Sequence, residues 1–216
     1  MFRNPEIPFT YNYSQPEEYH FSIDSIEMPW EVARYLKEKN IPAEELKRWQ
    51  VLDLCAGTGV LGFELNFHIP QIQKIDFVEV QSVYQEFFEK NKRLAEKEDS
   101  EFRFLNLNYE KLCLPEFEKR YQLILCNPPY FFPDQGKMSP SDFKNRCRFF
   151  IDSTFEKLIE TIDFCLAMEG EAFVLVRDQE AHGRDLLQEL RRLIKNNLKC
   201  ENLCMIRDTF LLRLYR

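Results

Sequence analysis

The residues Asn127-Pro128-Pro129-Tyr130 offer the clearest chemistry in the sequence. They follow an apolar run at residues 123–126, and two consecutive prolines end a strand because neither can donate a backbone hydrogen bond. The Asn127 side-chain oxygen and the Pro128 carbonyl are two acceptors that suit a planar amino group, which carries two N–H donors. Tyr130 adds a flat ring on which a base or an amide can stack. A turn that merely ends a strand is the plainer interpretation of these four residues.

A glycine-rich turn supplies a candidate cofactor site. Gly57, Gly59 and Gly62 follow an apolar strand at residues 50–54, and this spacing lets the backbone turn tightly and approach a ligand. Glu79 lies about 20 residues after the second glycine, the spacing expected for a carboxylate on ribose hydroxyls. The same glycine spacing also fits a nicotinamide cofactor.

Asp53 separates these two cofactor classes. It lies in the strand four residues before Gly57, where a carboxylate would oppose the pyrophosphate of a dinucleotide. A negative charge there suits a ligand with a cationic amine and a sulfonium. The pattern therefore favours S-adenosylmethionine and leaves a nicotinamide cofactor as the less favoured alternative.

The composition limits the classes of function. The net charge is −7 over 216 residues, so a nucleic-acid partner would need a local basic patch. The seven cysteines include no Cys-x2-Cys pair, which predicts buried thiols in a reducing compartment and no metal site. The chain starts without an apolar signal core, and no run approaches about 18 apolar residues. We expect a cytoplasmic protein without a membrane segment.

Strands alternate with helices along the chain, which predicts an α/β fold with a seven-stranded, mostly parallel sheet and helices on both faces. The expected strands are 50–54, 74–80, 101–107, 121–126 and 171–177, followed by an antiparallel C-terminal hairpin within 200–216. The expected helices are 24–40, 43–49, 60–67, 83–97, 151–166 and 185–196. Residues 1–18 are expected to form an N-terminal arm and residues 19–216 one domain. The glycine turn and the Asn127 turn would then meet where the strand order reverses.

With these motifs, the sequence resembles the S-adenosylmethionine-dependent N6-adenine methyltransferases, which have a class I, Rossmann-like core. Within that family it is most similar to small bacterial enzymes that methylate an adenine next to the anticodon of a valine tRNA. The resemblance covers most of residues 19–177. It is carried by Tyr19-His-Phe21-Ser-Ile-Asp24-Ser, residues 51–62, the strand of Glu79, Asn127-Pro-Pro-Tyr-Phe131 and residues 136–140.

The resemblance implies a role for each matching residue. The implied cofactor-binding residues are Phe21, Asp53, Cys55, Gly57, Gly59, Glu79, Asn108 and Asn127. The implied catalytic residues are Asn127, Pro128 and Tyr130, with Pro129 and Phe131 on the substrate side. Two positions depart from the family pattern: Asn108 stands where the family usually has an Asp, and Cys55 stands where many relatives have Gly.

A basic stretch from Lys137 to Arg148 is the best sequence feature for RNA. It holds Lys137, Lys144, Arg146 and Arg148 against only Asp142, a local charge of +3 in an acidic protein. Phosphate contact is the sharper interpretation, and a solvated loop is the plainer one. The same two interpretations apply equally to a second group of cations: Arg184, Arg191, Arg192, Lys195 and Lys199.

The leading hypothesis is transfer of a methyl group to the N6 of an adenine in RNA, with tRNA as the expected partner. A protein glutamine-N5 methyltransferase would use the same tetrapeptide. A non-catalytic cofactor-binding protein and a nicotinamide oxidoreductase are the remaining alternatives. The sequence does not identify the RNA, the nucleotide or the oligomeric state.

Overall fold

The computed structural model describes residues 10–134, 137–177, 185–194 and 198–216 of the chain. These residues form a seven-stranded sheet in the order β3-β2-β1-β4-β5-β7-β6. The strands are β1 (Gln50–Leu54), β2 (Lys74–Glu79), β3 (Glu101–Asn106), β4 (Tyr121–Cys126), β5 (Leu166–Arg177), β6 (Lys199–Ile206) and β7 (Thr209–Tyr215). Strands β1 to β5 pair in parallel, and β7 pairs antiparallel to both β5 and β6. The predicted α/β sheet and its antiparallel C-terminal hairpin are confirmed.

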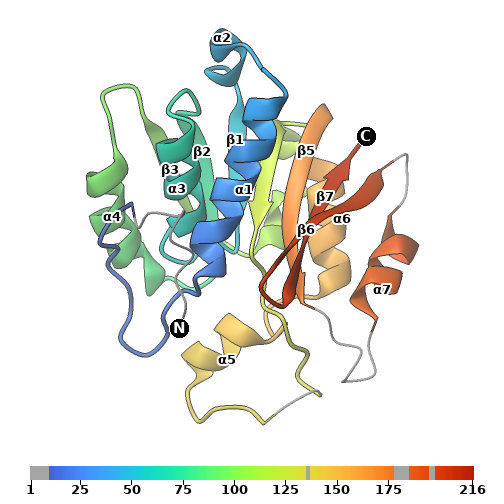
Figure 1. The fold of residues 1–216 in the computed structure, drawn as a ribbon. Helices are drawn as coiled ribbons and strands as arrows, with labels where there is room; N and C mark the ends of the chain where they lie inside the picture. The colour runs from blue at the N-terminus through green and yellow to red at the C-terminus, as the bar shows by residue number, and fades with distance from the viewer. Residues whose placement is uncertain (1–9, 135–136, 178–184, 195–197) are drawn as a thin grey trace.

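Helices cover both faces of the sheet (Figure 1). The α-helices are α1 (Asp24–Glu38), α2 (Ala43–Leu46), α3 (Val60–His68), α4 (Tyr84–Ala95), α5 (Asp142–Arg148), α6 (Phe155–Cys165) and α7 (Leu186–Leu193). Two short 3-10 helices, η1 (Tyr109–Leu112) and η2 (Pro115–Phe117), lie between β3 and β4. Helices α1, α3 and α4 pack on one face, and α6 and α7 pack on the other. Helix α5 lies beyond the carboxyl ends of the strands, beside the NH2-terminal segment.

The central strands alternate between two hydrophobic cores. Val51 of β1 packs with the core under α1, α3 and α4, whereas Leu52 packs with the core under α6. Leu125 and Ile124 of β4 divide in the same way, and all four side chains are fully buried. Because side chains alternate across a strand, a strand covered on both sides needs continuous apolar residues. This explains why Leu123 to Cys126 of β4 form an unbroken apolar run and why Asp53 is the one charged residue of β1.

The strand register brings the two chemical motifs together. Leu54, the last residue of β1, pairs with Cys126, the last residue of β4. The glycine turn and Asn127 therefore begin side by side at the carboxyl edge of the sheet. This is the place where strand order reverses, as predicted, and where ligands bind in open α/β sheets.

Several predicted boundaries were wrong, for local reasons. Helix α6 begins after Thr154, whose side chain accepts a hydrogen bond from the Lys157 backbone N–H, and so excludes Ile151. Strand β5 starts at Leu166 instead of residue 171, and Gly170 lies inside it. A Cβ at Gly170 would lie 2.9 Å from the Tyr121 carbonyl oxygen, so this glycine serves close strand packing and does not end a helix.

Helices α1 and α5 start in different ways. Helix α1 begins at residue 24, as expected, its cap position is Ile23, and no side chain caps it. Helix α5 was not predicted; Ser141 caps it by accepting from the Lys144 backbone N–H. A helix of seven residues carries too little periodicity to stand out in a sequence.

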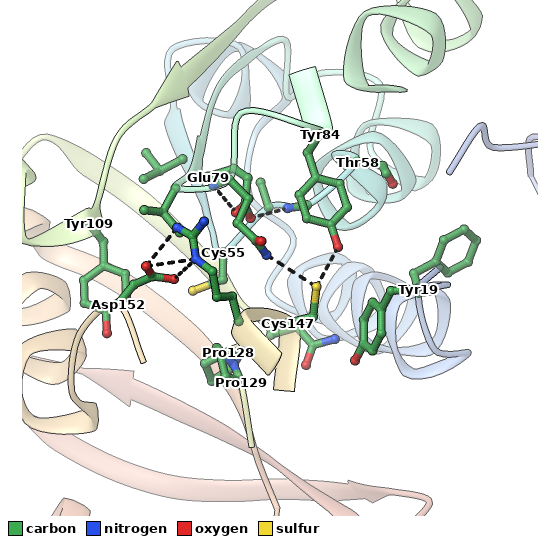
Figure 2. A pocket seen from close by; sticks show the side chains of 18 of the residues that line it. Tyr19, Cys55, Thr58, Glu79, Tyr84, Tyr109, Pro128, Pro129, Cys147 and Asp152 are labelled. Carbon is green, nitrogen blue, oxygen red and sulfur yellow. Dashed lines mark hydrogen bonds and ion pairs between the residues drawn. The ribbon is translucent and has the colours of Figure 1, made fainter. Parts of the chain in front are cut away.

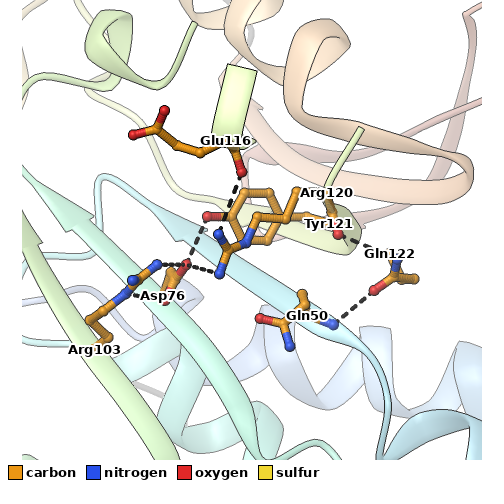
Figure 3. A network of polar contacts seen from close by, with 7 residues as sticks. All are labelled: Gln50, Asp76, Arg103, Glu116, Arg120, Tyr121 and Gln122. Atoms are coloured by element: carbon orange, nitrogen blue, oxygen red, sulfur yellow. Dashed lines mark hydrogen bonds and ion pairs between the residues drawn. The ribbon is translucent and has the colours of Figure 1, made fainter. Parts of the chain in front are cut away.

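A polar network joins β2, β3 and β4 away from the glycine turn (Figure 3). The buried Asp76 carboxylate accepts from Arg103 Nε at 2.9 Å and Nη2 at 2.7 Å, and from the Tyr121 hydroxyl at 2.8 Å. Arg120 lies 3.8 Å from the same carboxylate. A buried carboxylate with several donors is stable only when all of them stay in place. This network therefore fixes the sheet and takes no part in the pocket.

Candidate cofactor and substrate site

A pocket opens at the carboxyl edge of the sheet, between the glycine turn, the end of β2, the Asn127 turn, α5 and the segment before α1 (Figure 2). Of the predicted site residues, it brings together Phe21, Cys55, Gly57, Glu79, Asn108, Asn127, Pro128, Pro129, Tyr130 and Arg146. Those that lie outside its wall are Asp53, Gly59, Phe131, Lys137, Lys144 and Arg148.

The glycine turn has an unusual backbone. Cys55 and Gly57 have φ angles of 58° and 53°, in the left-handed region that favours glycine. A Cβ added at Gly57 would meet only the Tyr84 ring, at 3.9 Å, so the space beside it is open. At Gly59, in contrast, a Cβ would lie 2.6 Å from the Phe63 ring. Gly57 therefore makes room for a ligand, and Gly59 makes room for the protein core.

Glu79 lies in the pocket wall at the end of β2. Its two carboxylate oxygens accept backbone N–H groups, from Gly57 at 3.0 Å and from Gln81 at 2.8 Å. Burial raises the pKa of Glu79 to about 7, against the lowering effect of those hydrogen bonds and of Arg146. Each carboxylate oxygen has a further lone pair, which suits a hydroxyl donor.

Asp53 has a different position from the one expected. It is fully buried beneath the turn, and one oxygen accepts from the Gly62 backbone N–H at 3.0 Å, tying β1 to α3. The other oxygen has no hydrogen-bond partner. Burial raises the pKa of Asp53 to about 8. Direct contact between Asp53 and a cofactor stays a prediction.

Arg146 lies in the pocket wall, engaged with a carboxylate. Its Nε donates to both Asp152 oxygens, at 3.0 and 2.9 Å, and its Nη2 lies 2.8 Å from one of them. Asn108 contacts the same residue of the pocket wall. Its Nδ2 donates to the Asp152 backbone carbonyl oxygen at 2.8 Å, and its Oδ1 accepts from the Glu110 backbone N–H. Arg146 was expected to bind RNA, and that role stays a prediction; in the structure its positive charge also lowers the pKa of Glu79.

Asn127 faces the pocket with both ends of its amide held. Its Oδ1 accepts from the Tyr130 hydroxyl at 2.5 Å, and its Nδ2 donates to Ser25 Oγ at 3.1 Å. Ser25 comes from the first turn of α1 and is buried. Because the Asn127 amide nitrogen donates to Ser25, the amide oxygen is the atom that faces the Tyr130 hydroxyl. Tyr130 was expected to offer its ring face to a base or an amide; in the structure its hydroxyl also donates to Asn127.

Sequence analysis missed several residues of the pocket wall. Tyr84, at the start of α4, hydrogen-bonds Cys147 Sγ at 3.1 Å, and Gln81 Nε2 donates to the same sulfur at 3.4 Å. Gln15 belongs to the N-terminal arm expected at residues 1–18, and Tyr19 is the first residue of the expected domain; both line the pocket. Aromatic residues just after the Glu79 strand were the available signal for Tyr84, and nothing in the sequence marks Cys147.

The segment from residue 10 to 18 is fastened to the domain. Glu64 of α3 accepts from the Tyr13 hydroxyl at 2.7 Å and from Thr10 Oγ1 at 2.6 Å. Asn91 of α4 exchanges hydrogen bonds with the Ser14 backbone, at 2.7 and 3.0 Å. These contacts hold the start of the chain against the helices that flank the pocket.

Most of the basic residues expected to bind RNA belong to α5, whose Arg146 lines the pocket. Lys137 and Arg148 are exposed and Lys144 is half-buried. In the second cationic group, Arg191 and Lys199 are exposed. Arg184 and Lys195 lie outside the described residues.

The chain matches the family model described as Methyltransferase small domain over residues 35–197. It belongs to that family. A tRNA1(Val) (adenine(37)-N6)-methyltransferase of Shewanella baltica is 26% identical over 171 residues, covering 72% of this chain and 68% of that protein. One of Flavobacterium psychrophilum is 28% identical over 130 residues, covering 60% and 53%. The family match supports methyltransferase activity and not the nicotinamide oxidoreductase that the glycine spacing had left as an alternative.

Solved structures agree on the fold of this Methyltransferase small domain protein. The ribosomal protein L11 methylase of Lactobacillus delbrueckii subsp. bulgaricus superposes with a TM-score of 0.58 at 12% identity, covering 91% of this chain and 80% of that one. Pyrococcus horikoshii TYW2 in complex with MeSAdo gives a TM-score of 0.56 at 15% identity, covering 90% and 62%. The fold is a Rossmann-like class I methyltransferase fold.

The cofactor is S-adenosylmethionine, and the pocket fits it. Open space beside Gly57 admits a ligand close to the backbone, and Glu79 offers acceptors for ribose hydroxyls. Phe21, Leu107 and Tyr109 line the same pocket and would give an adenine apolar and aromatic surface. The described residues contain no cluster of His, Cys, Asp and Glu that could hold a metal ion. Among the helices formed by those residues, none has both the length and the apolar character to cross a membrane.

Proposed function

We propose that this protein methylates the exocyclic N6 of an adenine in RNA, with tRNA as the substrate. The observation that carries the proposal is that Asn127 lines the same pocket as Gly57 and Glu79. The names of the two bacterial relatives support adenine in tRNA as the target. A tRNA substrate would also agree with the cytoplasmic location expected from the sequence.

The residues of the turn would act on the target amine by position. Asn127 Oδ1 has two lone pairs, so it accepts one amine N–H while keeping the Tyr130 hydroxyl, and the Pro128 carbonyl accepts the other. Two acceptors hold the nitrogen in place and favour a more pyramidal geometry, which frees its lone pair for attack. S-adenosylmethionine supplies the electrophilic methyl group. No histidine base is needed because the proton leaves after transfer.

Access to the pocket limits the form of the substrate. An adenine inside a duplex cannot reach it, so the base must be unpaired or flipped out. A glutamine side chain presents the same planar amino group, so a protein glutamine-N5 methyltransferase is the alternative that the experiment must separate.

The test uses labelled S-adenosylmethionine with tRNA lacking the modification and, separately, with a protein extract. We expect label in tRNA, recovered as N6-methyladenosine by mass spectrometry of nucleosides. Asn127→Ala should lower kcat at least ~100-fold, the scale seen when one preorganised polar contact is removed from an active site. Asn202→Ala, an exposed amide on β6, is the control and should keep full activity. Label in protein alone would reject the proposal.

A further inference from the structure

Phe131 follows the Asn127 turn directly and has a fixed position. Its backbone N–H donates to the Arg148 carbonyl oxygen at 2.9 Å, and its own carbonyl oxygen accepts from Phe150 at 2.8 Å. These bonds pair Phe131 with Phe149, and the two rings lie 5.8 Å apart. The Phe131 ring is half-buried and lies outside the cofactor pocket. The residue that follows Tyr130 in the chain therefore carries an aromatic ring on a hydrogen-bonded backbone.

Two guanidinium groups flank this ring from separate parts of the chain. Arg148, at the end of α5, lies 5.6 Å from the Phe131 ring centre, and Arg177, at the end of β5, lies 5.8 Å from it. Arg148 is exposed, and the side chain of Arg177 is 38% exposed. We call these three residues the Phe131 cluster.

An acidic residue already occupies part of the cluster. Arg177 is ion-paired with Asp208, which is in the turn between β6 and β7 and is 62% exposed. An exposed ion pair contributes little stability, so an incoming anion can displace Asp208 at small cost. The chain has a net charge of −7, so two arginines beside one ring form a local concentration of positive charge in an acidic protein.

We infer that the Phe131 cluster binds the single-stranded nucleotide adjoining the target adenine. The inference rests on the proposed function and adds the surface that would position the RNA. The arginines would contact the flanking phosphates, and Phe131 with its stacked guanidinium would receive the neighbouring base. An acidic peptide would need the charges alone, whereas single-stranded RNA uses both the charges and the ring face.

The experiment measures KM for tRNA at several salt concentrations, together with fluorescence anisotropy of a short, labelled single-stranded RNA. Arg148→Gln should raise KM about fivefold and make the slope of log KM against log salt shallower by ~0.7, the value for one lost phosphate contact. Phe131→Leu should raise KM about tenfold with an unchanged slope, because stacking is not ionic. Phe131→Tyr keeps the ring face and should restore binding.

Asp208→Asn gives a change of opposite sign. It frees Arg177, so RNA should bind a few-fold more tightly. The Kd for S-adenosylmethionine should stay unchanged in all four variants, which also shows that they are folded. Lys157→Gln, which removes an exposed cation on α6, is the control and should behave as the wild type.

The outcomes separate this inference from the proposed function. Unchanged KM and anisotropy in both Arg148→Gln and Phe131→Leu would overturn the cluster while tRNA methylation stands. Competition by an acidic peptide, with Phe131→Leu neutral, would equally overturn it in favour of a protein partner. If the wild type methylates no RNA but the labelled RNA still binds and loses affinity in these variants, the proposed function fails and the cluster remains.

Discussion

The two halves of the pocket are built in different ways. On the cofactor side, Glu79 is held by two backbone N–H groups, and the turn at Gly57 is set by local backbone geometry. On the substrate side, Asn127 is held by two side chains, Tyr130 and Ser25, and Ser25 is 102 residues distant in sequence. Backbone contacts survive most substitutions, whereas each side-chain contact depends on one residue. Cofactor binding should therefore be lost when core packing is disturbed or Glu79 is replaced. Substrate positioning should be lost when a single hydroxyl group, on Tyr130 or Ser25, is removed.

The largest effect is expected where the cofactor half packs on the core. A Cβ at Gly62 would lie 2.4 Å from the Phe77 ring, so Gly62→Val should destabilise the protein by about 3 kcal/mol, or roughly 10 °C in Tm. Gly57→Ala is the matched control, because its Cβ meets open space and only its left-handed φ opposes the change, at about 1 kcal/mol. Thermal unfolding followed by circular dichroism measures both. Equal Tm values for the two variants would contradict this account.

A smaller effect is expected from Glu79→Gln. The amide keeps one acceptor oxygen, so one backbone N–H and one ribose hydroxyl lose their charged partner, at about 2 kcal/mol, or roughly 30-fold in Kd for the cofactor. The wild-type affinity should also rise as the pH increases through about 7, because burial raises the pKa of Glu79 to about 7 and the ionised form is the better acceptor. Asp152 favours the protonated form and Arg146 the ionised one. Calorimetry across this pH range should find no such rise in the Glu79→Gln variant.

The smallest of the three effects concerns Ser25→Ala on the substrate side. Without the serine hydroxyl, the Asn127 amide is free to turn and present its NH2 group to a substrate that is itself a donor. We expect kcat to fall about tenfold, the scale of one hydrogen bond. The Kd for S-adenosylmethionine should not change, and Ser25→Thr should restore kcat. Thr161→Val removes a buried hydroxyl on α6 and serves as the control. An unaltered kcat would show that Tyr130 alone orients Asn127.

The same division explains what the sequence could predict. Gly57, Glu79 and Asn127 were found because strand ends and glycine turns are local patterns, and the parallel sheet then determines their meeting. Arg146 was assigned to RNA because its charge is visible in sequence, but its partner Asp152 depends on the unpredicted helix α5. Ser25 and Cys147 were missed because each acts through a tertiary contact with a residue far along the chain. Residues in local sequence motifs could be predicted from the sequence, whereas side-chain contacts between residues far apart in the chain could not.

The segment that holds Thr10 and Tyr13 has a consequence for how the protein would fail. Its hydrogen bonds satisfy Glu64 and Asn91, and its continuation supplies Gln15 and Tyr19 to the pocket. A protease that cut and released this segment would remove Gln15 and Tyr19 from the pocket wall. It would also take both hydroxyl donors from Glu64 and leave Asn91 with only the Thr58 carbonyl oxygen as a partner. One cut would therefore weaken cofactor binding and lower the thermal stability together, although the sheet, the glycine turn and the Asn127 turn would keep their sequence.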